Sequence, residues 1–165
     1  MKKAGQYIKW FLIFAVLVAV DQITKQLAVM ELKGTSGFPI INNVFKLYYL
    51  ENHGAAFGIF QNQRIPLLII TIIVLFFIGL IFSKVPQESK FIPVKWILVT
   101  LAAGAVGNMI DRMLNGYVVD FLYFQLINFP VFNVADCYVV ISAVLAAILI
   151  IFFYDEKDLD NIMKR

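Results

Sequence analysis

The chain has 165 residues, of which 61% are hydrophobic and 15% are charged. Soluble domains average about 45–50% apolar and about 25% charged residues, so this composition excludes a soluble domain and indicates a polytopic membrane protein. The formal net charge of +3 is small and spread along the chain, and no basic cluster alternates with aromatic residues, which argues against a nucleic-acid-binding protein.

Four segments are long and apolar enough to cross a bilayer, which takes about 20 residues of helix. The predicted spans cover about residues 10–30, 66–82, 96–114 and 137–154. The N-terminus has the basic start of a signal peptide, but no A-x-A cleavage site follows, so we interpret it as an uncleaved first span. We expect a single integral membrane domain over residues 1–165.

The two longer connections, 31–65 and 115–136, differ in pattern. "FPIINNVFKLYYLEN" contains β-favouring residues in partial alternation, interrupted by Asn42-Asn43, and predicts a small hairpin or sheet outside the membrane. The following stretch, "GAAFGIFQNQR" at 54–64, predicts a short amphipathic turn of helix near the membrane surface.

The distribution of Lys and Arg predicts the orientation of the chain. The N-terminal tail, the 83–95 loop and the C-terminal tail are basic, whereas the 31–65 loop has three such residues and the 115–136 loop has none. Both termini should therefore face the cytoplasm and both longer loops the outside. The basic residues of the three inner segments are Lys2, Lys3, Lys9, Lys84, Lys90, Lys95, Lys157, Lys164 and Arg165.

Under this orientation, the polar residues of the spans gather at the outer membrane surface. Asp21 and Lys25 share a helix face at the spacing i and i+4. The third span places Asn108, Asp111 and Arg112 on one face as well. Charge within a membrane is costly and marks either a structural pair or a functional site. We interpret Asp21–Lys25 and Asp111–Arg112 as pairs at helix ends, with long side chains that reach water.

Asp120 and Asp136 have no Lys or Arg near them in the sequence, because none lies between residues 113 and 156. Asp136 could be the N-cap of the last helix, and Asp120 could be a solvated loop acid. Together they could instead share one proton, so that one activates water and the other polarises a carbonyl. Aspartyl peptide hydrolysis needs no metal or cofactor, and one cysteine and one histidine are too few for a zinc site.

Two functions of other classes compete with a peptidase. A small proton-coupled transporter or channel subunit could use the aspartates as a relay, although the inner halves of the spans lack further ionisable residues. A non-enzymatic membrane assembly factor could use the outer loop as a docking surface. Such a factor would tolerate isosteric loss of either acid, whereas a peptidase would not.

Five motifs, in order and at matching spacing, resemble those of the bacterial lipoprotein signal peptidases, also called type II signal peptidases. These motifs are "DQITK" at 21–25, "ENHGAAFG" at 51–58, "GNMIDR" at 107–112, "VVDF" at 118–121 and "FNVAD" at 132–136. The resemblance covers nearly the whole chain. It implies an all-α membrane protein of four transmembrane helices with a small extracytoplasmic β-cradle, located in the bacterial cell membrane.

The resemblance also implies a reaction and a set of site residues. The expected protein is an aspartic endopeptidase that removes the signal peptide from diacylglyceryl-modified prolipoproteins, cutting before the lipidated cysteine. Asp120 and Asp136 would be catalytic. Substrate-binding or supporting roles would belong to Asn52, Gly54, Asn108, Arg112 and Asn133, and structural or supporting roles to Asp21, Lys25 and Asp111. The expected partners are these prolipoproteins and membrane lipids, not nucleic acid, and we expect a monomer.

Overall fold

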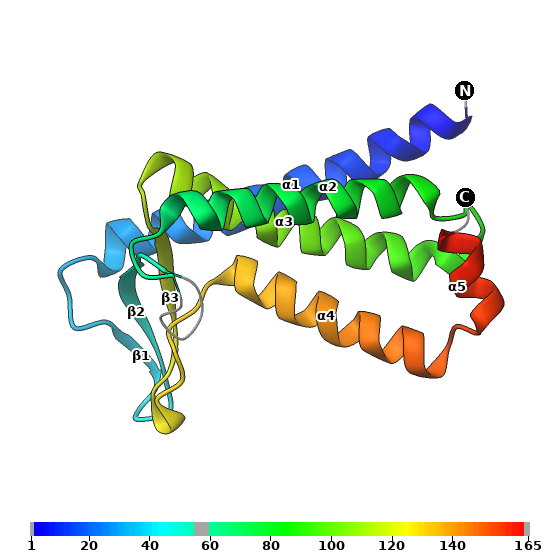
Figure 1. Ribbon diagram of the computed structural model, residues 1–165. Coiled ribbons are helices and arrows are strands. Elements are labelled where there is room, and N and C mark those ends of the chain that lie inside the picture. The colour runs from blue at the N-terminus through cyan, green and yellow to red at the C-terminus, as the bar shows by residue number, and fades with distance from the viewer. Residues whose placement is uncertain (1, 55–59, 164–165) are drawn as a thin grey trace.

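The computed structural model describes residues 2–54 and 60–163 of the chain (Figure 1). Within them it has four long helices: α1 (Lys2–Leu32), α2 (Arg64–Lys84), α3 (Ile92–Leu114) and α4 (Val134–Phe152). Each is long and apolar enough to cross a bilayer, where only a helix or a closed barrel satisfies the backbone polar groups. The predicted fold of four transmembrane helices with a small sheet is confirmed.

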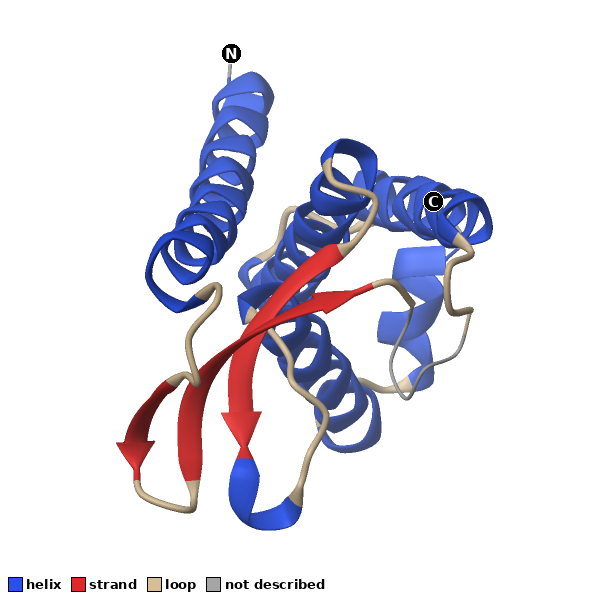
Figure 2. Ribbon diagram, turned by 90° about the vertical axis from the view of Figure 1, so that its left-hand side faces the viewer, coloured by secondary structure: helices blue, strands red, loops and turns tan. Residues whose placement is uncertain are grey.

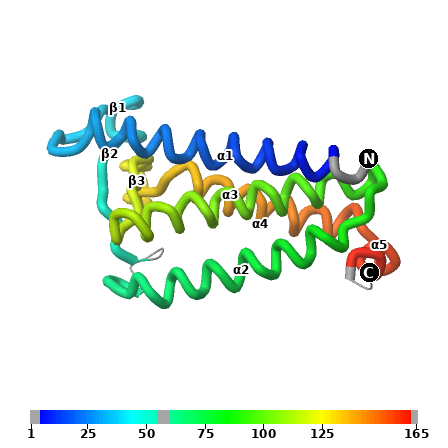
Figure 3. The backbone as a smooth tube through the Cα atoms, turned by 90° about the horizontal axis from the view of Figure 1, so that it is seen from above, coloured from blue at the N-terminus to red at the C-terminus, as the bar shows by residue number. Residues whose placement is uncertain are grey.

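The bundle is organised around α3, which packs against all three other long helices. Figure 3 shows α3 between α1 and α2, with α4 beside it. Close approach to α4 requires a glycine, because a Cβ on Gly104 would lie 2.5 Å from the carbonyl oxygen of Ala135. Small residues in "AAGAVG" therefore allow tight helix packing, as such residues do in other membrane proteins.

A three-stranded antiparallel sheet closes one end of the bundle, in the order β1 (Phe38–Ile41), β2 (Phe45–Asn52), β3 (Val118–Phe124). The predicted hairpin is confirmed as β1 and β2, with Asn43 in the left-handed conformation at φ +60°. Strand β3 belongs to the other long connection and was not predicted. Figure 2 shows the strands side by side against the ends of the helices. Both long connections thus meet at one end, here called the sheet end.

The chain termini lie together at the opposite end, here called the termini end (Figure 1). An unpredicted short helix, α5 (Glu156–Met163), folds back there against the loop between α2 and α3. The Lys90 ammonium donates to Asp158 Oδ1 at 2.6 Å, and the Tyr154 hydroxyl donates to the Lys90 carbonyl at 2.9 Å. Buried Ile162 and Phe91 belong to the apolar cluster that α5 covers.

Two predicted boundaries need comment. The fourth helix begins at Val134 instead of near residue 137, so Asp136 lies inside its first turn. The predicted helical turn at 54–64 includes residues 55–59, which lie outside the described part of the chain. Helix α2 begins at Arg64, the last residue of the predicted stretch.

Candidate active site

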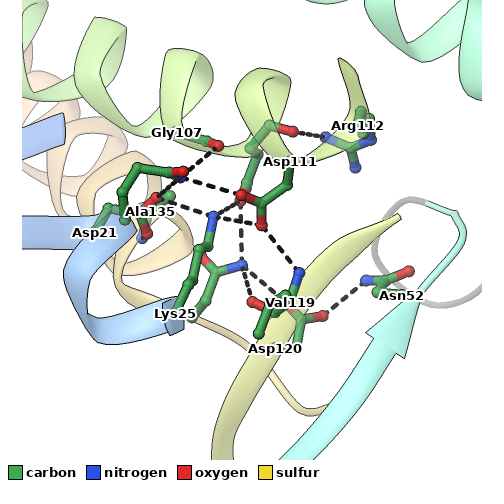
Figure 4. Close-up of polar contacts among 12 residues, drawn as sticks. Asp21, Lys25, Asn52, Gly107, Asp111, Arg112, Val119, Asp120 and Ala135 are labelled. Carbon is green, nitrogen blue, oxygen red and sulfur yellow. Dashed lines mark hydrogen bonds and ion pairs between the residues drawn. The ribbon is translucent and has the colours of Figure 1, made fainter. Parts of the chain in front are cut away.

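The candidate site lies at the sheet end, where α1, α3, α4 and the sheet meet (Figure 4). The structure brings together residues that are up to 114 positions apart in the sequence. Every site residue expected from the sequence is linked to this cluster by a hydrogen bond or an ion pair. These residues are Asp21, Lys25, Asn52, Gly54, Asn108, Asp111, Arg112, Asp120, Asn133 and Asp136.

One buried cation organises the first part of the cluster. The side chain of Lys25 is only 3% exposed, and its Nζ lies 2.9 Å from Asp21 Oδ2 and 3.1 Å from Asp111 Oδ2. Its ammonium also donates to Asn108 Oδ1 at 2.9 Å. Three acceptors therefore match the three N–H donors of the ammonium, which is the condition for a stable buried charge.

The predicted ion pair between Asp111 and Arg112 is wrong. Neighbouring residues on a helix point in different directions, so Asp111 faces α1 and pairs with Lys25. The Arg112 guanidinium points away and donates to the Gly54 carbonyl at 3.0 Å. Lys25 also differs from the expectation for a long side chain at a helix end, because it is buried and does not reach water.

The remaining bonds of the two paired acids tie separate elements together. Asp21 Oδ1 accepts from the Ala135 backbone N–H at 2.9 Å, and Asp111 Oδ2 accepts from the Val119 backbone N–H at 3.0 Å. The first bond holds the start of α4 and the second holds β3. The lysine cluster, defined as Asp21, Lys25 and Asp111, thereby fixes the two elements that contain the other two acids.

Asp120 lies on β3 and is 1% exposed. Among the described residues its donors are two side-chain amides: Asn133 Nδ2 donates to Oδ1 at 2.6 Å, and Asn52 Nδ2 donates to Oδ2 at 2.9 Å. Burial raises the pKa of Asp120 to about 7, and the negative charge of Asp136 acts in the same direction.

Asp136 lies in the first turn of α4, where Asn133 is the N-cap and not Asp136 as the sequence suggested. The two residues form a capping box, with Asn133 N donating to Asp136 Oδ2 at 3.1 Å and Asp136 N donating to Asn133 Oδ1 at 3.0 Å. Only Oδ2 is used by the cap. The other oxygen, Oδ1, accepts from Asn108 Nδ2 at 2.8 Å.

Two asparagines connect the lysine cluster to Asp120 and Asp136. Because Asn108 Oδ1 faces the Lys25 ammonium, its Nδ2 must face Asp136. Because Asn133 Oδ1 accepts the cap bond, its Nδ2 must face Asp120. The amides therefore have one orientation each, and both point N–H groups at the acids.

A cavity of about 800 Å³ opens at this point and is lined by both Asp120 and Asp136. Asn52, Asn108 and Arg112 also line it, and the rest of its wall is mainly apolar. A large apolar pocket with a few convergent polar groups and a perturbed pKa is the expected form of an active site. The apolar part of the wall comes from Phe129–Phe132 and from Val139, Val140 and Ile141 of α4.

Two contributors were not singled out from the sequence. Gln22 Nε2 donates to Asp111 Oδ1 at 3.0 Å and to the Gly107 carbonyl at 3.2 Å, so it joins α1 to α3. A Cβ on Gly107 would clash with the carboxylate of Asp21, so only glycine leaves room for the lysine cluster there. Gln22 lies in the motif "DQITK" and Gly107 in the motif "GNMIDR", so membership of these motifs could have identified both residues from the sequence.

Fold and site together define a multi-pass membrane protein in which two aspartates, one buried and one half-buried, line a largely apolar cavity. The family model described as "Signal peptidase (SPase) II" matches residues 13–152. The chain therefore belongs to the signal peptidase II family and is a peptidase.

Individual relatives and solved structures agree with this assignment. The lipoprotein signal peptidase of Caldanaerobacter subterraneus is 43% identical over 85% of this chain and 94% of its own length. The lipoprotein signal peptidase of Clostridioides difficile is 40% identical over 87% of this chain and 95% of its own length. A structure described as a bacterial membrane enzyme at 2.3 Å resolution is 33% identical, has a TM-score of 0.80, and matches 95% of this chain and 93% of its own.

Proposed function

We propose that the protein is an aspartic endopeptidase that removes the signal peptide from diacylglyceryl-modified prolipoproteins, cutting before the lipidated cysteine. Membership of the signal peptidase II family supports the reaction. The observation that carries the aspartic mechanism is a pair of acids on one cavity, buried Asp120 and half-buried Asp136, whose side-chain hydrogen bonds come from neutral amides. Such a pair can share one proton and exchange it with water and substrate, whereas Asp21 and Asp111 are held in ion pairs with Lys25.

The geometry suggests which of the two acids, Asp120 or Asp136, carries the proton that they share. Asp136 lies at the N-terminus of α4, where the helix dipole and the cap N–H offset part of the cost of burying its charge. Asp120, with a pKa near 7, keeps the proton. Asp136 then takes a proton from the attacking water, while Asp120 donates a hydrogen bond to the oxygen of the scissile carbonyl.

Collapse of the tetrahedral intermediate completes the reaction. The C–N bond breaks, and the proton taken up by Asp136 passes to the leaving amine. Asp120 retains the proton that it shared with the carbonyl oxygen, so both acids return to their starting states. Arg112 and Asn52, which line the same cavity, are placed to hold the substrate backbone beside the acids.

The depth of the site fits a substrate that is itself a membrane helix. The cavity lies at the sheet-end termini of α3 and α4, so its acids are level with the edge of the apolar spans. The scissile bond of a signal peptide would reach this level when its apolar segment crosses the bilayer. We infer from the Lys and Arg distribution that this edge is the outer face of a bacterial cell membrane, with both termini in the cytoplasm.

A proton-coupled transporter is not favoured. A relay would have to continue along the spans, yet no Asp, Glu, Lys, Arg or His lies in residues 10–20, 96–107 or 137–154. The charged residues at the termini end make local contacts instead, such as that of Lys95 Nζ to Gln87 Oε1 at 2.9 Å.

Purified protein in lipid nanodiscs should be incubated with two versions of one precursor, with and without the diacylglyceryl group on the cysteine. We expect cleavage directly before the lipidated cysteine, read out by mass spectrometry, and much slower cleavage of the unlipidated precursor. Acyl chains contribute about 0.8 kcal/mol for each buried CH₂, enough to decide positioning. Equal rates for both versions would contradict the proposed substrate class.

A further inference from the structure

The far end of the sheet carries an apolar surface that the proposed reaction does not use. Large exposed side chains gather where β1, the 42–44 turn and the segment after β3 come together, and Leu126 and Ile127 are each 68% exposed. The Leu126 N–H donates to the Val44 carbonyl at 3.3 Å, which joins the two segments. We call this surface the sheet tip; it consists of Phe38, Ile41, Phe45, Phe124, Leu126 and Ile127.

The two faces of the sheet differ at the tip. Side chains alternate along a strand, so Phe124 lies on the same face as Asp120, which faces the cavity. Phe45 pairs with Phe124 across the strands, with ring centroids 4.8 Å apart, and Ile41 pairs with Phe45. The apolar face of the tip is therefore on the cavity side of the sheet, whereas Val119 and Phe121 on the other side pack against α1.

The opposite face is polar and aromatic. Lys46 Nζ lies over the rings of Tyr48 and Tyr123, at 4.7 and 5.6 Å from their centroids. The Tyr123 hydroxyl donates to Asn128 Oδ1 at 2.7 Å. Lys46 is the single charged residue in the stretches 37–50 and 121–132, and no acid occurs in either. Tyrosine and lysine beside exposed aliphatic residues are typical of a membrane–water interface.

The position of the tip indicates what the apolar face meets. The strands run across the bundle end, and the tip extends past the helices in two views (Figures 1 and 2). Because the helices cross the bilayer, the side of the sheet that faces the bundle is also the side that faces lipid. An exposed apolar cluster of this kind on a soluble surface would instead be an aggregation or docking site.

We propose that the sheet tip inserts into the headgroup and acyl boundary of the leaflet on its side, and anchors β3 to the bilayer. Asp120 is four residues from Phe124 on the same strand, or about 13 Å along it. The anchor therefore holds one of the two cavity acids at a fixed depth relative to lipid. The occupant is the bilayer itself, as the extension of the tip past the membrane-spanning helices and the position of Lys46 indicate.

Site-directed spin labelling tests this proposal without any substrate, so its outcome is independent of the proposed peptidase reaction. In a Cys137→Ala background, labels are placed by Ile127→Cys at the tip, Ser36→Cys in the turn after α1, and Ile73→Cys on the exposed face of α2. Collisions with oxygen and with a water-soluble nickel chelate are measured in nanodiscs. We expect position 127 to resemble lipid-facing position 73, with oxygen collisions dominating, and position 36 to show the reverse.

A second arm separates insertion of the tip from insertion of the label. A label at Phe38→Cys is compared with and without the double change Leu126→Asp and Ile127→Asp. Insertion driven by the tip predicts that the label at 38 moves into water in the double variant. Nickel-chelate access at 127 equal to that at 36, or an unmoved label at 38, would overturn the proposal.

Discussion

Two pairs of acids lie at the same end of the bundle, and their partners differ. Asp21 and Asp111 are buried and share the ammonium of Lys25. Asp120 is equally buried, and Asp136 lines the same cavity, but the hydrogen bonds of this second pair come from asparagine amides and the backbone. Burial alone therefore does not distinguish structural from reactive acids. One fixed ammonium holds both acids of the first pair, whereas amide and backbone N–H groups hold the second pair.

Removing the Lys25 ammonium is expected to have the largest effect on the first pair of acids. Lys25→Met would leave Asp21 and Asp111 buried without the ammonium that both of them contact. Breaking a buried pair in this way costs about 3–5 kcal/mol. We expect a large fall in thermal stability in detergent. Lys33→Met, which removes a cation from an exposed pair in the same region, is the matched control. Equal stability of both variants would show that the lysine cluster is not structural.

Packing at Gly107 offers a second way to disturb the lysine cluster while leaving its charges in place. Gly107→Ala places a methyl group against the carboxylate of Asp21, whereas Gly79→Ala on α2 meets nothing within 4 Å. Overpacking of this kind costs about 1–3 kcal/mol. The alanine at 107 should lower the melting temperature, and that at 79 should leave it unchanged or raise it slightly. A tolerated alanine at 107 would contradict the close fit between α1 and α3.

The pH dependence should separate the two pairs. In the folded protein the pKa of Asp120 is about 7, against about 3.9 in an unfolded chain. A raised carboxyl pKa means that its contribution to stability is full below about pH 4 and is lost as the pH rises through about 7. Activity that needs the proton on Asp120 should fall above pH 7, approaching tenfold per pH unit.

This prediction is checked by measuring kcat/KM from pH 5 to 9, and unfolding of wild type and Asp120→Asn over the same range. The Asn variant should gain stability relative to wild type as the pH rises, since it no longer buries a charge. Glu31→Gln, at an exposed carboxylate on α1, should show no such trend. A flat activity profile across pH 7 would contradict the assignment of the proton to Asp120.

The smallest effect is expected at an exposed pair. Lys33 Nζ lies 2.9 Å from Glu51 Oε1, and the Lys33 ammonium, followed by the Tyr49 hydroxyl, lowers the pKa of Glu51. Exposed pairs contribute only about 0–1 kcal/mol because water and salt screen them. Lys33→Gln should therefore change the melting temperature little, and less at high salt. A loss as large as that for Lys25→Met would remove the distinction between buried and exposed pairs.

The sequence predicted those features that depend on local pattern. Apolar runs predicted the four spans, Asn42-Asn43 predicted the hairpin turn, and the i, i+4 spacing predicted the Asp21–Lys25 pair. The lack of nearby Lys or Arg singled out Asp120 and Asp136, the motif resemblance implied their catalytic role, and the structure places both on one cavity. Their catalytic role stays a prediction until it is measured.

Features that depend on tertiary contacts were missed. Strand β3 forms by pairing with β2, and it lies in the 115–136 connection, for which the sequence predicts no strand. The partner of Asp111 is on another helix, so adjacency in the sequence suggested Arg112 wrongly. Asp136 looked like a cap because the helix start was placed too late, whereas Asn133 begins the helix and receives the cap bond. Helix α5 depends on Ile162 reaching an apolar cluster between other helices.

The most direct test of the account is the effect of Asp-to-Asn changes at the second pair of acids. Asn keeps the size and caps a helix about as well as Asp, but it cannot exchange the proton. Turnover of lipidated precursor should be lost in Asp120→Asn and in Asp136→Asn, with folding retained. The double variant should be scarcely worse than either single one, because the two residues act as a unit. Glu31→Gln should match wild type, and EDTA should have no effect. Substantial activity in either Asn variant, or inhibition by EDTA, would contradict the mechanism.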